Sequence, residues 1–250
     1  MIQGPKEAIE RFHIMILKDQ VPGLPVEEPL KGERPDFVWP NVDKPLGIEI
    51  TRLFKATPKG RRPMQMQESE TTVTVQIARY LYEQRDLPNL DMRVVFGNSE
   101  IKKSDRASLA NRLADTVQKS LPAPNSWVSF LNDLSDDSSL PEQISYLSIG
   151  RFDGLERNHW SVSDAGWVQE DFIDELQRRI DEKNKELPHY LKSCSRCWLL
   201  IVADGTGPSS FFDPSEDTKQ HPYHSLFHRT FFMEAFTQKV IELNTAGNAV

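Results

Sequence analysis

Apolar residues recur at the spacing of an amphipathic helix in five segments of the chain, and this pattern predicts five helices. Near the amino terminus Ile9, Phe12 and Ile16 recur at helical spacing, with Ile14 and Leu17 widening the apolar face. Where β-branched residues also cluster, at 66–84, length and an acidic start favour a helix over a strand. The expected helices cover residues 5–18, 66–84, 104–121, 163–187 and 226–243.

Short apolar runs bounded by Pro, Gly, Asn or Asp predict strands between these helices. The segments Pro35–Trp39 and Leu46–Thr51 flank a turn-rich stretch, which indicates that they pair. The run Trp198–Val202 has no polar residue, as is typical of a central strand covered on both faces. Residues 123–142 are expected to form a loop. The expected strands lie at 35–39, 46–51, 92–96, 144–149 and 198–202.

Helices and strands alternate without any repeat or low-complexity tract, so the sequence predicts a single α/β domain over residues 1–250, with one mixed central sheet flanked by helices. A content of 38% hydrophobic residues and five Trp fits a globular chain. No apolar run approaches the length of a membrane span and no signal-peptide pattern opens the chain, so the cytoplasm is the expected compartment and no membrane partner is expected.

The net charge of -7 excludes a protein that coats nucleic acid with its whole surface, because phosphate binding depends on cationic side chains. Any contact with phosphate must therefore be local. One stretch, between Glu49 and Glu68, is basic without an intervening acid, although a solvated loop would have the same composition. Its cationic residues are Arg52, Lys55, Lys59, Arg61 and Arg62.

Two acidic residues lie where strand geometry can bring them together. Alternation along the strand at 46–51 puts Glu49 and Thr51 on one face, while Ile48 and Ile50 pack on the other. If Asp36 on the paired strand lies opposite Glu49, the two carboxylates repel each other unless a cation lies between them. Oxygen ligands of this kind suit Mg²⁺ or Mn²⁺.

Pro35-Asp36, the short hairpin and Glu49-x-Thr51 resemble the PD-(D/E)xK motif of restriction-type endonucleases. A helix before the motif, and a helix and a strand after it, match the order of that superfamily over roughly residues 5–97. The resemblance implies a restriction-endonuclease-like core. It also implies a metal held by Asp36, Glu49 and the Ile50 carbonyl, which activates water for attack on a phosphodiester. It implies nucleic acid as the partner, with DNA favoured over RNA, and a homodimer if both strands are cut symmetrically.

The chain departs from the motif at its lysine, because Thr51 stands two positions after the second acid. A hydroxyl cannot supply the positive charge that orients water and stabilises the transition state. Some members of the superfamily take this group from elsewhere in the fold. Lys183 is one candidate, because it continues the apolar face of Leu176 and Ile180; the alternative is a packed stem with its ammonium in water. The other candidates are Arg52, Gln65, Gln67 and Glu68.

Two weaker signals also resemble this superfamily. Gln76 and Tyr80 form a Gln-x-x-x-Tyr pattern similar to a DNA-contacting nuclease helix, although such pairs arise often by chance. Glu10, or Glu7, on the first helix could approach the metal, or could simply favour the positive end of the helix. The predicted nucleic-acid contacts are Gln76 and, as phosphate contacts, Arg52, Lys55, Arg61 and Arg62.

Other function classes have less support. Cys194 and Cys197 with His221, His224 and His228 could form a structural zinc site, but Cys197 adjoins a buried strand, which favours a core role for the thiols. The main competing hypothesis is a catalytically inactive module that keeps the nuclease fold and acts through a partner, which Thr51 favours. No Gly-x-Ser-x-Gly, Gly-rich phosphate loop or His-Glu-x-x-His motif supports another hydrolase.

Overall fold

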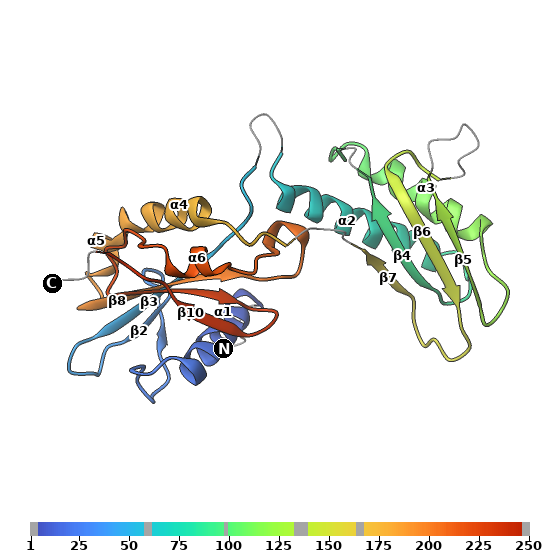
Figure 1. Cartoon of the computed structure of the whole chain (residues 1–250). Helices are drawn as coiled ribbons and strands as arrows, with labels where there is room; N and C mark the ends of the chain where they lie inside the picture. Colours follow the sequence, from blue (N-terminus) through green and yellow to red (C-terminus); the bar gives the residue numbers. More distant parts are fainter. Residues whose placement is uncertain (1–4, 58–61, 98–99, 133–139, 164–167, 247–250) are drawn as a thin grey trace. The chain divides into compact units, whose positions relative to one another are not determined.

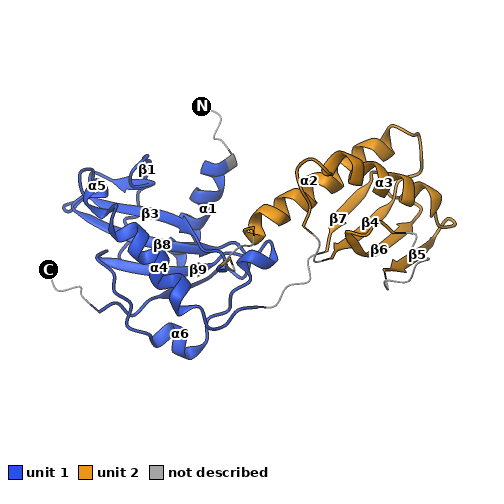
Figure 2. Ribbon diagram, turned by 90° about the horizontal axis from the view of Figure 1, so that it is seen from above, with its two compact units in different colours: residues 1–56, 166–250 blue, residues 57–165 orange. Residues whose placement is uncertain are grey.

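The computed structural model describes residues 5–57, 62–97, 100–132, 140–163 and 168–246 (Figure 1). The chain divides into two compact α/β units (Figure 2). The first combines Met1–Ala56 with Gly166–Val250, and the second is the intervening Thr57–Ala165. Each unit has its own sheet, so the expectation of one sheet holding all five strands is wrong: the strands at 92 and 144 lie apart from those at 35, 46 and 198.

The first unit is built on a six-stranded mixed sheet in the order β1-β2-β3-β8-β9-β10. β3, β8 and β9 are parallel neighbours, while β2 and β10 run antiparallel to the strands beside them. The pairing of the segments at 35 and 46 and the central position of the Trp198 run are confirmed. The strands are β1 (Leu30–Lys31), β2 (Phe37–Trp39), β3 (Leu46–Arg52), β8 (Arg196–Ala203), β9 (Arg229–Glu234) and β10 (Lys239–Glu242).

Helices cover both faces of this sheet. α1 (Pro5–Gln20) packs Ile14 and Leu17 on one face, in a cluster with Leu200 of β8. α4 (Ile173–Asn184) packs Leu176 and Ile180 on the other face. Both apolar stripes are consequences of helical periodicity. Shorter helical segments follow at α5 (Leu187–Tyr190), η1 (Pro208–Ser210) and α6 (Glu216–Gln220).

The inward face of α1 differs from the expected one. Ile9 and Phe12 are exposed at 45% and 41%, whereas Glu10 and His13 are buried. The apolar residues fit a helical stripe, but the helix is rotated so that two polar side chains face the sheet. Burying them costs free energy unless they have polar partners. This end of α1 is therefore a candidate position for a functional site.

α4 is shorter than expected, because it begins at Ile173 and not at residue 163. Phe172, just before the helix, is buried, whereas Val168 is exposed. Along the helix Arg178 and Arg179 pair with Glu182.

The expected helix at 226–243 is wrong, since this segment forms the hairpin of β9 and β10. Thr230, Phe231, Phe232 and Met233 are all buried, as in a strand covered on both faces. Phe236 lies in the turn between the two strands and is exposed. A block of consecutive apolar residues satisfies both periods, and pairing with β8 decides between them.

The second unit packs two helices on one face of a four-stranded sheet in the order β5-β6-β4-β7. The helices predicted at 66–84 and 104–121 and the strands at 92 and 144 are confirmed. The expected loop at 123–142 is wrong in part because it contains β5, and β7 was not expected. The elements are α2 (Met64–Glu83), β4 (Asp91–Phe96), α3 (Arg106–Lys119), β5 (Ser126–Leu131), β6 (Ile144–Arg151) and β7 (His159–Val162). Within the described ranges, no helix is long and apolar enough to cross a membrane.

Candidate functional site

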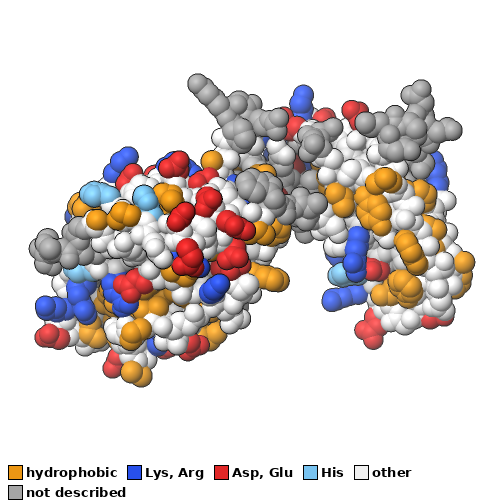
Figure 3. Space-filling view, in the orientation of Figure 1, with side chains coloured by type: hydrophobic (Ala, Val, Ile, Leu, Met, Phe, Trp, Pro, Cys, Tyr) orange, Lys and Arg blue, Asp and Glu red, His pale blue; other side chains and the backbone are white. Residues whose placement is uncertain are grey.

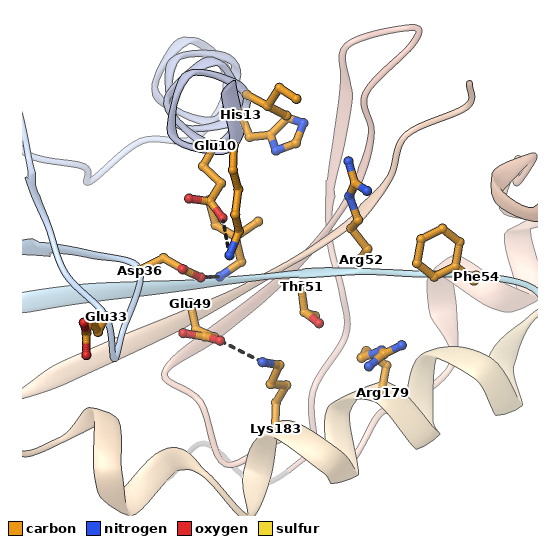
Figure 4. A pocket seen from close by; sticks show the side chains of 13 residues that line it. Glu10, His13, Glu33, Asp36, Glu49, Thr51, Arg52, Phe54, Arg179 and Lys183 are labelled. Atoms are coloured by element: carbon orange, nitrogen blue, oxygen red, sulfur yellow. Dashed lines mark hydrogen bonds and ion pairs between the residues drawn. The ribbon is translucent and has the colours of Figure 1, made fainter. Parts of the chain in front are cut away.

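A cavity of about 720 Å³ opens in the first unit where β3 extends beyond the end of its neighbour. β2 pairs with β3 only from Leu46 to Ile48, so the edge of β3 continues past the last β2 pairing. Residues on both faces of β3 line the cavity near this edge, together with residues on one face of α1 and one face of α4 (Figure 4). Its polar lining residues include Glu10, His13, Asp36, Glu49, Thr51, Arg52, Arg179 and Lys183.

Asp36 lies just before β2, at the position where one more residue of β2 would pair with β3. Its Oδ2 accepts a hydrogen bond from the Ile50 backbone N–H at 2.9 Å. The N–H and C=O of one strand residue point to the same edge, so the Ile50 carbonyl also faces this open edge. A carboxylate and a backbone carbonyl therefore lie together at the end of the hairpin, as the motif predicts.

Glu49 projects from β3 toward α4 and is buried, with Thr51 on the same face (Figure 4). Burial and the negative charge of Asp36 raise the pKa of Glu49, while Lys183 and the hydroxyl of Tyr190 act in the opposite direction. The Lys183 ammonium donates to Glu49 Oε1 at 2.7 Å. Burial and the charge of Glu49 in turn raise the pKa of Tyr190. The structure therefore brings Lys183 to the acidic pair, and its ammonium does not simply extend into water.

A second lysine, Lys31, lies between two acids on the other side of the site. Its Nζ is 2.8 Å from Glu10 Oε2 and 3.1 Å from Asp36 Oδ1. Burial tends to lower the pKa of Lys31, but the two carboxylates together raise it. Sequence reasoning missed this residue, because nothing local to the two-residue strand β1 indicates what its side chains meet.

On the α1 side of β3, Arg52 pairs with Asp204 at 3.0 Å and keeps 53% of its side chain exposed. His13 is buried, and its Nδ1 has no hydrogen-bond partner among the described residues. Burial lowers the pKa of His13, and Arg52 adds to this effect against the charges of Asp204 and Glu10. A neutral imidazole and an accessible guanidinium thus line the same wall (Figure 4).

Apart from Arg52, none of the predicted nucleic-acid contacts that the structure describes lines the cavity. Lys55 is buried, with its ammonium 5.9 Å from the centre of the Phe211 ring. Arg61 lies outside the described residues. Arg62 belongs to the second unit and pairs with Glu100 at 2.5 Å. Gln76 is exposed on α2, also in the second unit. The basic stretch is therefore divided between the two units.

The two cysteines lie in the core of the first unit. Cys194 Sγ is close to the Tyr190 carbonyl at 3.4 Å, and the Cys197 backbone N–H donates to His228 Nδ1 at 3.3 Å. Over the part of the chain that is described, no group of three or more His, Cys, Asp or Glu side chains could hold a metal ion. The donor set at the β3 edge is of a different kind, with two carboxylates and a carbonyl.

No family model, no curated protein and no solved structure matches this chain. What the protein does must therefore be inferred from the geometry of the site.

Proposed function

We propose that this protein is a metal-dependent nuclease of the PD-(D/E)xK type, with its active site at the open edge of β3. The observation that carries the proposal is the convergence of Asp36, Glu49 and the Ile50 carbonyl at that edge, with Lys183 bonded to Glu49. These are the groups that the motif requires, and they come from three separate segments of the chain.

The order of elements supports a restriction-endonuclease-like core. The first unit begins with a helix, α1, followed by the hairpin of β2 and β3 that bears the two acids. A second helix, α4, and a further strand, β8, come next within this unit, and β8 pairs with β3. The helix at 66–84 and the strand at 92–96, which the layout expected over 5–97 included, lie in the second unit, so that part of the expectation is wrong. The proposal assigns their places to α4 and β8, which follow the inserted unit. The inserted unit separates Glu49 from Lys183 by 134 positions.

Lys183 can take the part of the missing motif lysine. Glu49 and Thr51 share the face of β3 that looks toward α4, so an ammonium from α4 reaches the region where a lysine at position 51 would extend. A positive charge there would orient the attacking water and stabilise negative charge in the transition state. Arg52 and Arg179, both on the cavity wall, are placed to bind phosphate oxygens.

The donor set fits Mg²⁺ or Mn²⁺. The charge of Asp36 contributes to the raised pKa of Glu49, so a cation between these acids would favour the ionised form of both. When bound, the metal would polarise a phosphoryl oxygen and lower the pKa of a water molecule. Asp36, Glu49 and the Ile50 carbonyl would hold it. Glu10 could join them only after its ion pair with Lys31 opens.

A second candidate function is a non-catalytic nucleic-acid-binding or partner-binding module with the same fold. It is favoured by one observation, that lysines already neutralise both acids, Lys31 at Asp36 and Lys183 at Glu49. An acidic cluster balanced in this way needs no metal for stability.

A cleavage assay separates the two functions. The wild type and the variants Asp36→Asn and Lys183→Met are incubated with labelled single-stranded and duplex DNA and RNA in Mn²⁺. Lys185→Met is the matched control, because Lys185 is exposed just after α4. We expect cutting by the wild type and the control and at least about 100-fold slower cutting by the two site variants. Equal cutting by Asp36→Asn would refute the proposal, and a wild type that neither cuts nor binds Mn²⁺ in calorimetry would favour the second function.

A further inference from the structure

Among the described residues, no helix covers one face of the sheet of the second unit, and Figure 3 shows hydrophobic side chains beside charged ones on the surface of this unit. α2 and α3 pack against the face that carries Met92, Val94, Leu147 and Ile149. Because side chains alternate along a strand, the residues between these project from the opposite face, which we call the open face. Two rows of paired residues cross the open face. The first row holds Trp127, Gly150 and Asp91, and the second holds Ser129, Ser148 and Arg93.

Three aromatic side chains, those of Trp127, Tyr146 and Phe152, line a hollow of about 340 Å³ on the open face. Trp127 is 62% exposed, although a large apolar side chain normally gains by burial. Phe152 is 44% exposed, and its ring lies against Gly150, where an added Cβ would meet it at 2.5 Å. Glycine at position 150 therefore allows this ring to lie close to the strand opposite Trp127.

The hollow also has a polar part. Ser148 and Ser163 add hydroxyls to the aromatic lining, and Asp91 and Arg93 add charges. Asp91 Oδ1 is 2.9 Å from His159 Nδ1, and Asp91 Oδ2 is 3.7 Å from the Arg93 guanidinium. The hollow thus offers acceptors, donors and one cation in a small area.

We propose that the open face of the second unit binds an unpaired base of a single-stranded nucleic acid. A base has two apolar faces that stack on aromatic rings and an edge that carries both donors and acceptors. Trp127 and Phe152 stack on the base, Asp91 and Ser148 contact its edge, and Arg93 binds the adjoining phosphate. If the protein is the proposed nuclease, this binding site makes single-stranded nucleic acid its substrate class. The binding itself does not depend on the nuclease function, and only its biological purpose does.

Binding is measured on the full chain in EDTA, where metal-dependent cutting is suppressed. Fluorescence anisotropy follows a labelled 12-nucleotide oligo(dT), a matching oligo(U) and a duplex of the same length. We expect Trp127→Ala and Phe152→Ala each to weaken single-strand binding by about 10-fold, the loss of one stacked base. Trp127→Phe should recover most of the affinity.

Phe236→Ala is the matched control, because Phe236 is an exposed aromatic residue in the other unit. It should bind as the wild type does. Equal affinity of the wild type for duplex and single strand, no binding to either single strand, or unchanged binding by both Trp127→Ala and Phe152→Ala would overturn the inference. Asp36→Asn should bind normally, so loss of cutting alone would bear on the proposed function and not on the open face.

Discussion

The pair between Glu49 and Lys183 holds together two segments of the first unit that are distant in sequence. Lys183→Met keeps the aliphatic stem that packs along α4 but removes the ammonium that bonds Glu49 at 2.7 Å. The carboxylate is then left with the hydroxyl of Tyr190 as its remaining partner at this end. We expect the first unit to be destabilised at neutral pH.

The expected size follows from burial. Removing one partner of a fully buried ion pair costs about 3–5 kcal/mol, whereas a surface pair contributes less than about 1 kcal/mol. Here the side chain of Glu49 is 9% exposed and that of Lys183 is 22% exposed, so the pair lies between these limits. We expect Lys183→Met to lower the free energy of local unfolding around this pair by about 2 kcal/mol. This change corresponds to about 30-fold faster amide hydrogen exchange.

Hydrogen exchange followed by mass spectrometry on peptides from β3 and β8 isolates this effect from the second unit. The double variant Glu49→Gln/Lys183→Met should recover most of the protection, because it leaves no unpaired buried charge. The loss should also shrink as the pH falls, since a protonated Glu49 needs no cationic partner. Unchanged exchange in Lys183→Met, or a double variant as unstable as the single one, would refute the reasoning.

Three further predictions test other parts of the site. Gly47→Ala should destabilise the first unit by about 1–3 kcal/mol, because the added Cβ would lie 2.6 Å from Cys194 Sγ; thermal unfolding measures the loss, and an unchanged Tm would contradict it. Lys31→Met should tighten Mn²⁺ binding by about 5-fold in calorimetry, since it removes the ammonium that competes at Asp36. Glu49→Gln should make the stability of the first unit less dependent on pH. The raised pKa of Glu49 means that stability falls as the pH rises above 4.5, and this decline should be smaller in the variant in urea unfolding.

Local patterns predicted the parts of the site that belong to one segment. Alternation along the strand at 46–51 placed Glu49 and Thr51 on one face, and both lie on that face in the structure. The helical stripe of Leu176 and Ile180 marked Lys183 as a side chain that continues a buried face. These inferences hold because the period of a helix or strand acts over a few residues, whatever the rest of the chain does.

The sequence by itself determined the alternation of helices and strands, the acidic hairpin and the buried central strand. Only the tertiary structure decided that an entire α/β unit separates Glu49 from Lys183, that Lys31 lies between Glu10 and Asp36, and that the carboxyl-terminal apolar block is a hairpin. The physical reason is the same in each case. Which distant segments share a sheet depends on burying apolar faces against one another, and no local period carries that information.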